Sequence, residues 1–194
     1  MGRKKTFEEG AVLDVATTLF WQHGFDGTSY QLLERETGLS GRSLINAFGD
    51  KEALFAKVLT CYAASVQQDI EQLGSPSVAA ILNFFRNIEK SPSHSLRKNG
   101  CLLVNTIVGR DHLPESALVA VAKFKSDLLI FFSEALKADN ISAEDHKAEF
   151  LLSLLWGLSS RVRDQRSVKA VSPTLTVLQE IMTAWQQGAL LSDR

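Results

Sequence analysis

The sequence predicts an all-α protein of about nine helices, and three observations support this fold class. Apolar residues recur at intervals of three and four, which places them on one helix face, and no segment alternates as a strand does. Glycine, proline and short polar residues stand at the ends of these segments, where helices end and begin. Hydrophobic residues make up 45% of the 194 residues, which is ordinary for a folded protein with a large core.

Four helices are expected in the first part of the chain. Gly24 follows the last periodic residue of the first helix, where glycine favours a left-handed ending, and Gly38 stands where the second helix must reverse direction. Short polar side chains precede the next three helices as N-caps: Thr28 or Ser29, Ser40, and Asp50. The expected helices cover residues 6–23, 29–36, 41–48 and 51–73.

Five more helices are expected after Gly74-Ser-Pro-Ser77, where the composition changes. Pro114 and Pro173 stand where proline favours the first turn of a helix, and residues 91–99 form a polar loop. The expected helices cover residues 77–90, 100–109, 114–138, 142–166 and 173–187. We therefore expect two domains, residues 1–50 (continued by a connecting helix over 51–73) and residues 74–194.

Composition and charge exclude several classes of protein. The formal net charge of −1 excludes a uniformly basic nucleic-acid binder, but not a local DNA-binding surface. The two cysteines, Cys61 and Cys101, lie in no zinc or Cys-x-x-Cys pattern, so we expect no disulfide framework, metal or cofactor. The N-terminus has no apolar signal segment, and the longest apolar run, 150–158, is too short to span a membrane. We therefore expect a cytoplasmic protein.

The second and third helices, joined by a short turn containing Gly38, have the arrangement of a helix-turn-helix, whose second helix enters the major groove of DNA. Arg42 can donate two hydrogen bonds to guanine, and Asn46 can pair similarly with adenine. Leu44 and Phe48 are expected to point inward. Further candidates for contacts with phosphate or bases are Thr28, Ser29, Tyr30, Ser40 and Ser43. A helical hairpin with a solvated polar face is the alternative interpretation.

Four stretches carry a resemblance to a known family: Gly24-Phe-Asp-Gly-Thr-Ser29, Thr37-Gly-Leu-Ser40, Ser43-Leu44 and Phe48-Gly-Asp-Lys-Glu-Ala-Leu-Phe55. In order and spacing, over residues 7–60, they resemble the N-terminal domain of TetR/AcrR-type transcriptional regulators. The resemblance implies a three-helix DNA-binding head and a helical C-terminal domain that binds a small molecule and forms a homodimer. It also implies DNA contacts from six positions: Thr28, Tyr30, Arg42, Ser43, Asn46 and Lys51.

The chain departs from the family pattern at two positions. Ile45 stands where a tyrosine usually packs on the DNA backbone, so one phosphate contact is expected to be missing. Glu34 stands where a small alanine usually lies between the two helices, so their packing is expected to differ slightly. Residues 1–60 carry seven Lys/Arg against eight Asp/Glu, so DNA binding depends on a few placed cations, with Arg3-Lys-Lys5 as a flexible arm.

The last two helices are expected to form a homodimer interface. The helix from 142 to 166 is apolar around most of its circumference, and Ser153, Gly157 and Ser160 would let another helix approach closely. Two heads about 34 Å apart would meet successive major grooves of a near-palindromic, double-stranded operator. The expected interface residues are Leu151, Leu154, Leu155, Gly157, Leu158, Leu178, Met182 and Trp185. Burial of these residues inside one monomer is the alternative.

The aromatic residues and the second cysteine of the C-terminal part are the candidates for an effector site. The aromatic residues that either line a cavity or form ordinary core are Phe84, Phe85, Phe124, Phe131, Phe132 and Trp156. Gly100-Cys-Leu-Leu-Val-Asn-Thr106 resembles a segment in a subgroup of these regulators, some of which sense electrophiles or oxidants through a cysteine. Arg97 and Lys98 precede it, and nearby cations lower the pKa of a thiol, so Cys101 is a candidate sensor. A buried, inert thiol is the alternative.

No set of residues indicates an enzyme, because the four histidines are scattered and no nucleophile or phosphate-binding motif is present. We therefore expect a sequence-specific DNA-binding regulator, a repressor that a small molecule releases by favouring a dimer with wrongly spaced heads. An electrophile or oxidant is one candidate effector. The alternative, from a different class, is a helical protein that senses a small molecule or the redox state without binding DNA.

Overall fold

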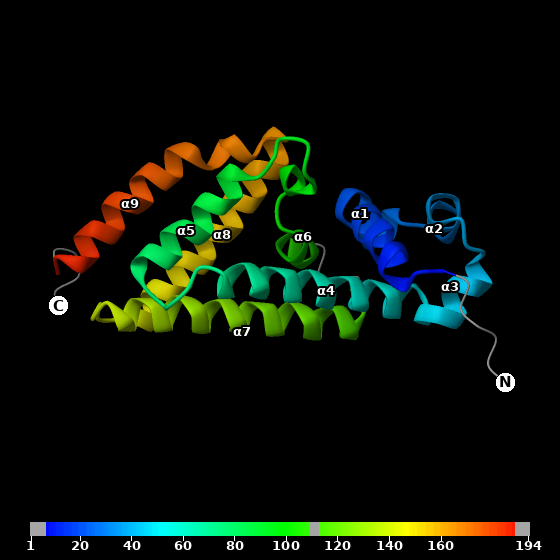
Figure 1. The fold of residues 1–194 in the computed structure, drawn as a ribbon, viewed down its shortest axis with the longest axis horizontal. Coiled ribbons are helices and arrows are strands. Elements are labelled where there is room, and N and C mark those ends of the chain that lie inside the picture. Colours follow the sequence, from blue (N-terminus) through cyan, green and yellow to red (C-terminus); the bar gives the residue numbers. More distant parts are fainter. Residues whose placement is uncertain (1–6, 109–112, 189–194) are drawn as a thin grey trace.

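The computed structural model describes residues 7–108 and 113–188, and none of these residues lies in a strand. The all-α expectation is confirmed, with nine α-helices and two short 3-10 helices in the described part of the chain. The molecule is elongated, with α1–α3 at one end and α5, α8 and α9 toward the other (Figure 1). The helices are α1 Glu9–Gly27, α2 Tyr30–Thr37, α3 Gly41–Phe48, α4 Lys51–Glu71, α5 Val78–Lys90, η1 Leu96–Asn99, α6 Leu102–Val108, α7 Glu115–Ala138, α8 Glu144–Gln165, η3 Val168–Val171 and α9 Ser172–Gln186.

The ends of the first four helices follow local side-chain chemistry. Ser29 caps α2 by accepting the Leu32 N–H at 3.2 Å, and Gly38 ends it in the left-handed region with φ 72°. Ser40 caps α3 and Asp50 caps α4, each with a side-chain oxygen that accepts a backbone N–H of the first turn. The backbone also leaves the helical conformation at Gly24 (φ 72°, ψ −178°), so the last turn of α1 lies beyond a kink.

Helices α1, α2 and α3 pack together as a head, which we define as residues 9–48. Leu33 of α2 and Leu44 of α3 are almost completely buried, and Phe48 is 7% exposed. The ring of Phe20 in α1 lies 4.7 Å from the ring of Phe55 in α4, between ring centroids. The first turns of α4 therefore complete the core of the head.

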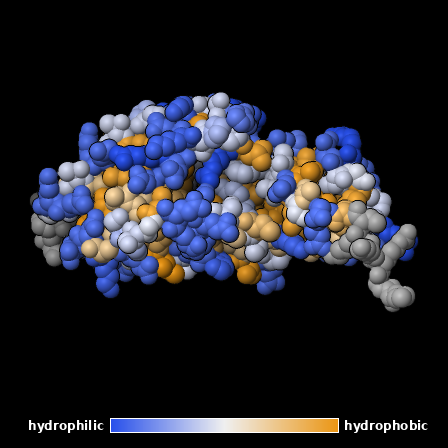
Figure 2. Space-filling model, viewed as in Figure 1, coloured by the Kyte–Doolittle hydropathy of each residue, from blue (hydrophilic) through white to orange (hydrophobic). Residues whose placement is uncertain are grey.

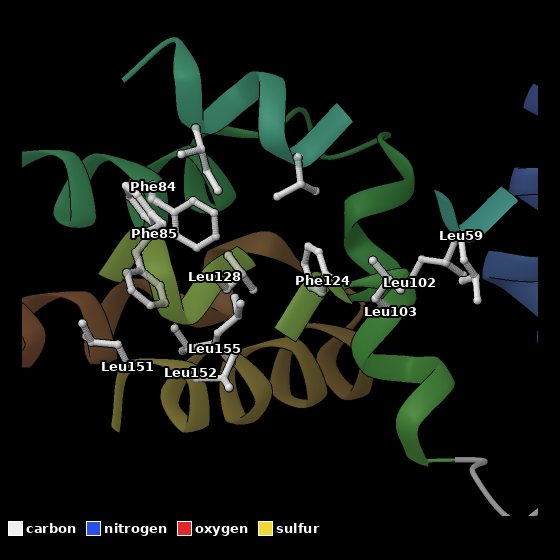
Figure 3. Close-up of a cluster of buried hydrophobic side chains, with 14 of the residues drawn as sticks. Leu59, Phe84, Phe85, Leu102, Leu103, Phe124, Leu128, Leu151, Leu152 and Leu155 are labelled. Carbon is white, nitrogen blue, oxygen red and sulfur yellow. The ribbon is translucent and has the colours of Figure 1, made fainter. Parts of the chain in front are cut away.

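The rest of the chain forms a helical body, residues 78–186, around α7 and α8. Helix α4 runs from the head along α7, and α7 packs against α8 (Figure 1). Phe84 and Phe85 of α5 lie near Leu128 of α7 and Leu155 of α8 in the centre of the body (Figure 3). The buried residues form one continuous cluster from Val12 to Trp185, so the core passes from head to body without a break.

The surface is mixed rather than dominated by one apolar face. Figure 2 shows hydrophobic patches separated by hydrophilic residues on the face that it presents. In the described ranges, no helix combines the length and the apolar composition that crossing a membrane requires.

Candidate functional site

The turn between α2 and α3 holds the two helices at a fixed angle. Gly38 supplies the left-handed residue, and its N–H donates to the carbonyl of Glu34 at 2.9 Å. The Glu34 carboxylate also accepts the N–H of Gly41, the first residue of α3. The first N–H groups of a helix have no acceptor within the helix, and the N–H of Gly41 is one of them. Glu34 supplies that acceptor and so links α2 to α3.

One face of α3 packs inward and the other is open. Leu44 and Phe48 are buried against the head, whereas Arg42 and Asn46 are exposed. No described residue forms an ion pair with the Arg42 guanidinium. The open face therefore carries one side chain that can donate two parallel hydrogen bonds and one amide.

The candidate phosphate contacts differ in exposure. The expectation for the Thr28 hydroxyl is wrong in this structure, because Thr28 is completely buried and its hydroxyl donates to the Gly24 carbonyl at 2.8 Å. Ser29 is exposed and Tyr30 is half-buried at the start of α2. Lys51 is half-buried, and its ammonium donates to the Phe25 carbonyl at 3.1 Å while lying 4.2 Å above the Phe25 ring.

Two serines lie at the start of α3. Ser40 is exposed and Ser43 is half-buried, and their hydroxyl oxygens are 3.0 Å apart. Either hydroxyl can therefore donate to the other or to a group on DNA. The proposed arm Arg3-Lys-Lys5 lies outside the residues that the structure describes.

A cavity of about 50 Å³ lies in the body, between α4, α5, η1, α7 and α8. This space is larger than one water molecule needs and smaller than a cavity that takes benzene. Its polar side is formed by the ion pair of Arg97 with Asp69, whose Nη2 and Oδ2 are 2.6 Å apart. The lining residues are Tyr62, Val66, Asp69, Leu73, Phe84, Asn87, Ile88, Arg97, Gly100, Cys101, Phe124, Leu155, Ser159 and Val162.

Only part of the expected aromatic lining reaches this cavity. Phe84 and Phe124 line it. The expectation is wrong for Phe85 and Phe131, which are buried in the aromatic core around Phe132; the Phe85 and Phe132 rings stack with centroids 5.9 Å apart. Trp156 does not reach this cavity but lines a second, mostly apolar pocket of about 290 Å³ between α6, α7 and α8.

The thiol of Cys101 lies in the cavity wall beside the Tyr62 hydroxyl. Burial raises the pKa of Cys101, and the hydrogen bond from Tyr62 and the charge of Arg97 lower it by less. Burial, with the facing thiol, also raises the pKa of Tyr62. The expectation of a lowered thiol pKa is therefore wrong, because the desolvation of this site outweighs its nearest cation.

The cavity wall is bonded directly to the head. The indole N–H of Trp21 in α1 donates to the Gly100 carbonyl at 3.0 Å, and the Trp21 ring meets the Tyr62 ring edge-on at 5.0 Å. The N–H of Cys101 donates to the Ser159 hydroxyl at 2.7 Å. Residues 100–101 are thus joined by hydrogen bonds both to α1 of the head and to α8 of the body.

Most residues expected at a dimer interface are buried inside one monomer. The expectation is wrong for the six that already lie in the core of the body: Leu151, Leu155, Leu158, Leu178, Met182 and Trp185. Leu154 is half-buried and Gly157 is exposed with open space around it. Periodicity identified apolar positions correctly, but the second helix that covers them belongs to the same chain.

Several residues of these sites were missed by sequence reasoning. Tyr62, Asp69 and Ser159 reach the cavity from helices far apart in the sequence, and no local pattern marks them. Trp21 of α1 donates a hydrogen bond to Gly100, 79 residues away in the sequence, and no local pattern marks this partner either. Within the described ranges, no group of three or more His, Cys, Asp or Glu side chains is placed to hold a metal ion.

The family model, the relatives and the solved structure that match this chain all describe transcriptional regulators. Residues 12–58 match the family model described as bacterial regulatory proteins, tetR family. The transcriptional repressor ComR of Escherichia coli K12 is 28% identical over 190 residues, which cover 87% of this chain and 85% of ComR. The repressor BdcR of the same organism is 24% identical over 182 residues, covering 92% and 91% of the two chains.

A solved structure extends the similarity to the whole fold. A cysteine-substituted variant of the TetR family regulator CifR, complexed with 26-bp double-strand operator DNA, superposes with a TM-score of 0.78. It is 25% identical in sequence, and the match covers 95% of this chain and 100% of the CifR chain. The similarity thus includes the body as well as the head.

Proposed function

This chain belongs to the TetR family of bacterial regulatory proteins, and on that premise we propose that it is a transcriptional repressor released from its operator by a small molecule. It is a DNA-binding regulator rather than an enzyme, as its relatives are. The observation that carries the proposal is the open face of α3, where Arg42 and Asn46 project from a capped helix with no partner among the described residues. As a regulator of genes it acts in the cytoplasm.

The head supports a division of contacts between bases and phosphates. Arg42 would bind guanine through two N–H groups, and Asn46 would pair with adenine in the same groove. Phosphate contacts would come from the exposed donors around the two short helices: Ser29, Tyr30, Ser40, Ser43 and the free donors of Lys51. The backbone N–H of Thr28 is excluded from this set, because it already donates to the Phe25 carbonyl.

A homodimer would use the outer faces of α8 and α9 instead of their buried faces. Gly157 is open, Leu154 is half-buried, and Phe150 and Val177 are exposed apolar side chains on these two helices. Small and apolar residues on an open helix face favour close packing of a second helix. Two-fold pairing there would present two heads to successive major grooves.

The effector would bind in the cavity beneath α5, and release would follow from a shift between two dimer arrangements. A ligand that fills the cavity must move its walls, and the wall at Gly100 is bonded to Trp21 of the head. Helix α4 also spans both regions, since Lys51 begins it in the head and Tyr62 lines the cavity. The hydrogen bond from Trp21 and helix α4 both support the proposal that a ligand in the cavity changes the distance between the two heads of the dimer.

Cys101 remains a candidate sensor of electrophiles, although its raised pKa makes it a slow nucleophile at neutral pH. If it is the sensor, N-ethylmaleimide releases the protein and a Cys61→Ser control from the operator but leaves the Cys101→Ser variant bound. The rate of release then rises as the pH passes above the ordinary range of a thiol pKa. Release of the Cys101→Ser variant at the parent rate would place the sensing elsewhere.

The decisive experiment is selection of genomic DNA fragments by the purified protein, followed by binding of the selected fragments over a salt series. We expect an enriched near-palindromic site bound at least about a thousandfold more tightly than random duplex. Weak, salt-sensitive binding to every fragment, repeated after unfolding and refolding to remove a bound ligand, would instead support a helical sensor without a DNA role.

A further inference from the structure

An exposed apolar side chain lies in the middle of the recognition helix. Ile45 is 48% exposed, whereas its neighbour Leu44 is 1% exposed in the core of the head. Ile45 is three residues after Arg42 and adjacent to Asn46, so all three project from the open face of α3. The face proposed to meet bases therefore carries one apolar group beside its two polar ones.

The fold gives no reason for isoleucine at this position. The inward packing of α3 is supplied by Leu44 and Phe48, and α3 is only eight residues long. A β-branched residue in an exposed helix position lowers helix stability relative to alanine, because its side chain loses rotamer freedom. Folding of α3 therefore does not require isoleucine here; what distinguishes Ile45 from other exposed apolar residues is its place on the open face beside Arg42 and Asn46.

Base chemistry offers one partner for such a group in the major groove. Among the four bases, only thymine presents a methyl group there, and apolar side chains contact it directly. Isoleucine has no hydrogen-bond donor, so it contributes nothing to phosphate binding or to the edges of guanine and adenine. Contact with a methyl group removes apolar surface of both partners from water.

We propose that Ile45 is a specificity-determining residue that contacts the C5 methyl group of a thymine, next to the bases bound by Arg42 and Asn46. The proposal rests on the proposed DNA-binding function and adds a third type of base to the site. Each half-site of the operator then contains a thymine whose methyl group faces α3.

The test uses the operator obtained by selection, with deoxyuridine replacing thymine at one position of each half-site at a time. This exchange removes the methyl group and leaves the base pairing unchanged. At one position we expect the affinity of the parent protein to fall about 4-fold per half-site, the change expected from losing the burial of one methyl group. At the same position the affinity of the Ile45→Ala variant should not change.

Two controls separate this contact from other effects. Val119→Ala removes a β-branched side chain that is 64% exposed on α7, and it should keep the sensitivity of the parent to deoxyuridine. Circular dichroism and urea unfolding check that Ile45→Ala retains the fold. The proposal is overturned if deoxyuridine at every position affects the parent and Ile45→Ala equally.

The outcomes also distinguish this proposal from the one on which it rests. A selected operator that the parent binds specifically, but without sensitivity to any thymine methyl group, removes the role of Ile45 and leaves the regulator intact. Absence of any specific operator overturns both.

Discussion

The head and the body carry their functional side chains in opposite ways. In the head, Arg42 and Asn46 are exposed on a helix whose other face is already packed, so the fold does not need them. In the body, the cavity is lined by residues such as Phe84 and Leu155 that also form the core. Function in the head is therefore separable from folding, whereas function in the body depends on the same packing that stabilises it.

The largest expected effect tests the body at Gly100. This residue has φ +81°, and a Cβ added to it would lie 2.6 Å from the backbone oxygen of Ser159. Gly100→Ala should therefore lower the free energy of unfolding by about 2–4 kcal/mol, through a left-handed alanine and a clash with the backbone of α8. Urea unfolding followed by circular dichroism measures the change.

Gly10→Ala is the matched control for that prediction. Gly10 lies in the first turn of α1, with a helical backbone and no atom within 4 Å of an added Cβ. The control should raise the free energy of unfolding by at most about 1 kcal/mol, since alanine restricts the unfolded chain more than glycine does. Equal stability of the two variants would contradict the close approach of residue 100 to α8.

The second prediction tests the head at Arg42. Arg42→Ala should weaken operator binding by about 1–3 kcal/mol and relax the choice of base at one position of each half-site. Because its side chain is exposed and unpaired among the described residues, the free energy of unfolding should change by less than about 0.5 kcal/mol. Binding to a set of operator variants with single-base changes tests the effect on base choice. Urea unfolding of the same variant tests the effect on stability.

Lys137→Ala removes the same charge from the far end of α7 and serves as the control. It should leave the pattern of preferred bases unchanged. The role of Arg42 is refuted if its variant binds all operator variants with the same ranking as the parent does.

The difference between the two regions also explains how far the sequence could predict the structure. Helix ends in the head depend on residues close in sequence, so the caps Ser40 and Asp50 were predicted correctly, and Ser29 was one of the two candidates for the cap of α2. Thr28 was assigned wrongly because its hydroxyl bonds to Gly24 within the same turn, a choice that residue type alone does not reveal.

In the body, the sequence identified the apolar positions but not their neighbours. Leu151 and Met182 were correctly taken as apolar helix faces, yet whether a second chain or another helix of the same chain covers them depends on tertiary packing. The same limit applies to the cavity, where Phe84 lines the space and the adjacent Phe85 does not. Neighbouring residues on a helix point to different sides, and only the fold decides which side is empty.

Trp21 tests the boundary between the two regions, because it belongs to the head and bonds to the cavity wall. Trp21→Phe keeps an aromatic ring but leaves the Gly100 carbonyl without its donor. We expect a loss of about 1–2 kcal/mol in the free energy of unfolding, the cost of an unsatisfied buried acceptor. Operator affinity without effector should change little, since Trp21 is buried away from the open face of α3.

Trp185→Phe is the control, because Trp185 is as buried as Trp21 at 8% exposure and lies wholly within the body. The indole N–H of Trp185 has no acceptor among the described residues. Trp185→Phe should therefore lower the free energy of unfolding by about 1 kcal/mol less than Trp21→Phe does. If both variants lose the same stability, the bond between Trp21 and Gly100 contributes nothing measurable, and coupling through it is excluded.

The smallest expected effect compares the helix caps of the two regions. The Asp50 carboxylate accepts the Ala53 N–H at 2.8 Å and is the side-chain N-cap of α4. At the start of α5, Ser77 accepts the Ala80 N–H, and Asp139 from the end of α7 accepts a second backbone N–H there. The body thus adds a tertiary cap where the head has only a local one.

Asp50→Ala should therefore cost about 1 kcal/mol in the free energy of unfolding, and Ser77→Ala about half as much. The Asp139 carboxylate still stabilises the positive end of α5 when the Ser77 hydroxyl is lost, whereas α4 loses both its acceptor and a favourable charge. Asp50→Asn keeps the acceptor and should cost no more than a few tenths of a kcal/mol. If Ser77→Ala lowers the free energy of unfolding as much as Asp50→Ala does, the contact from Asp139 does not stabilise the start of α5. Helix ends in the body would then depend on local side chains, as they do in the head.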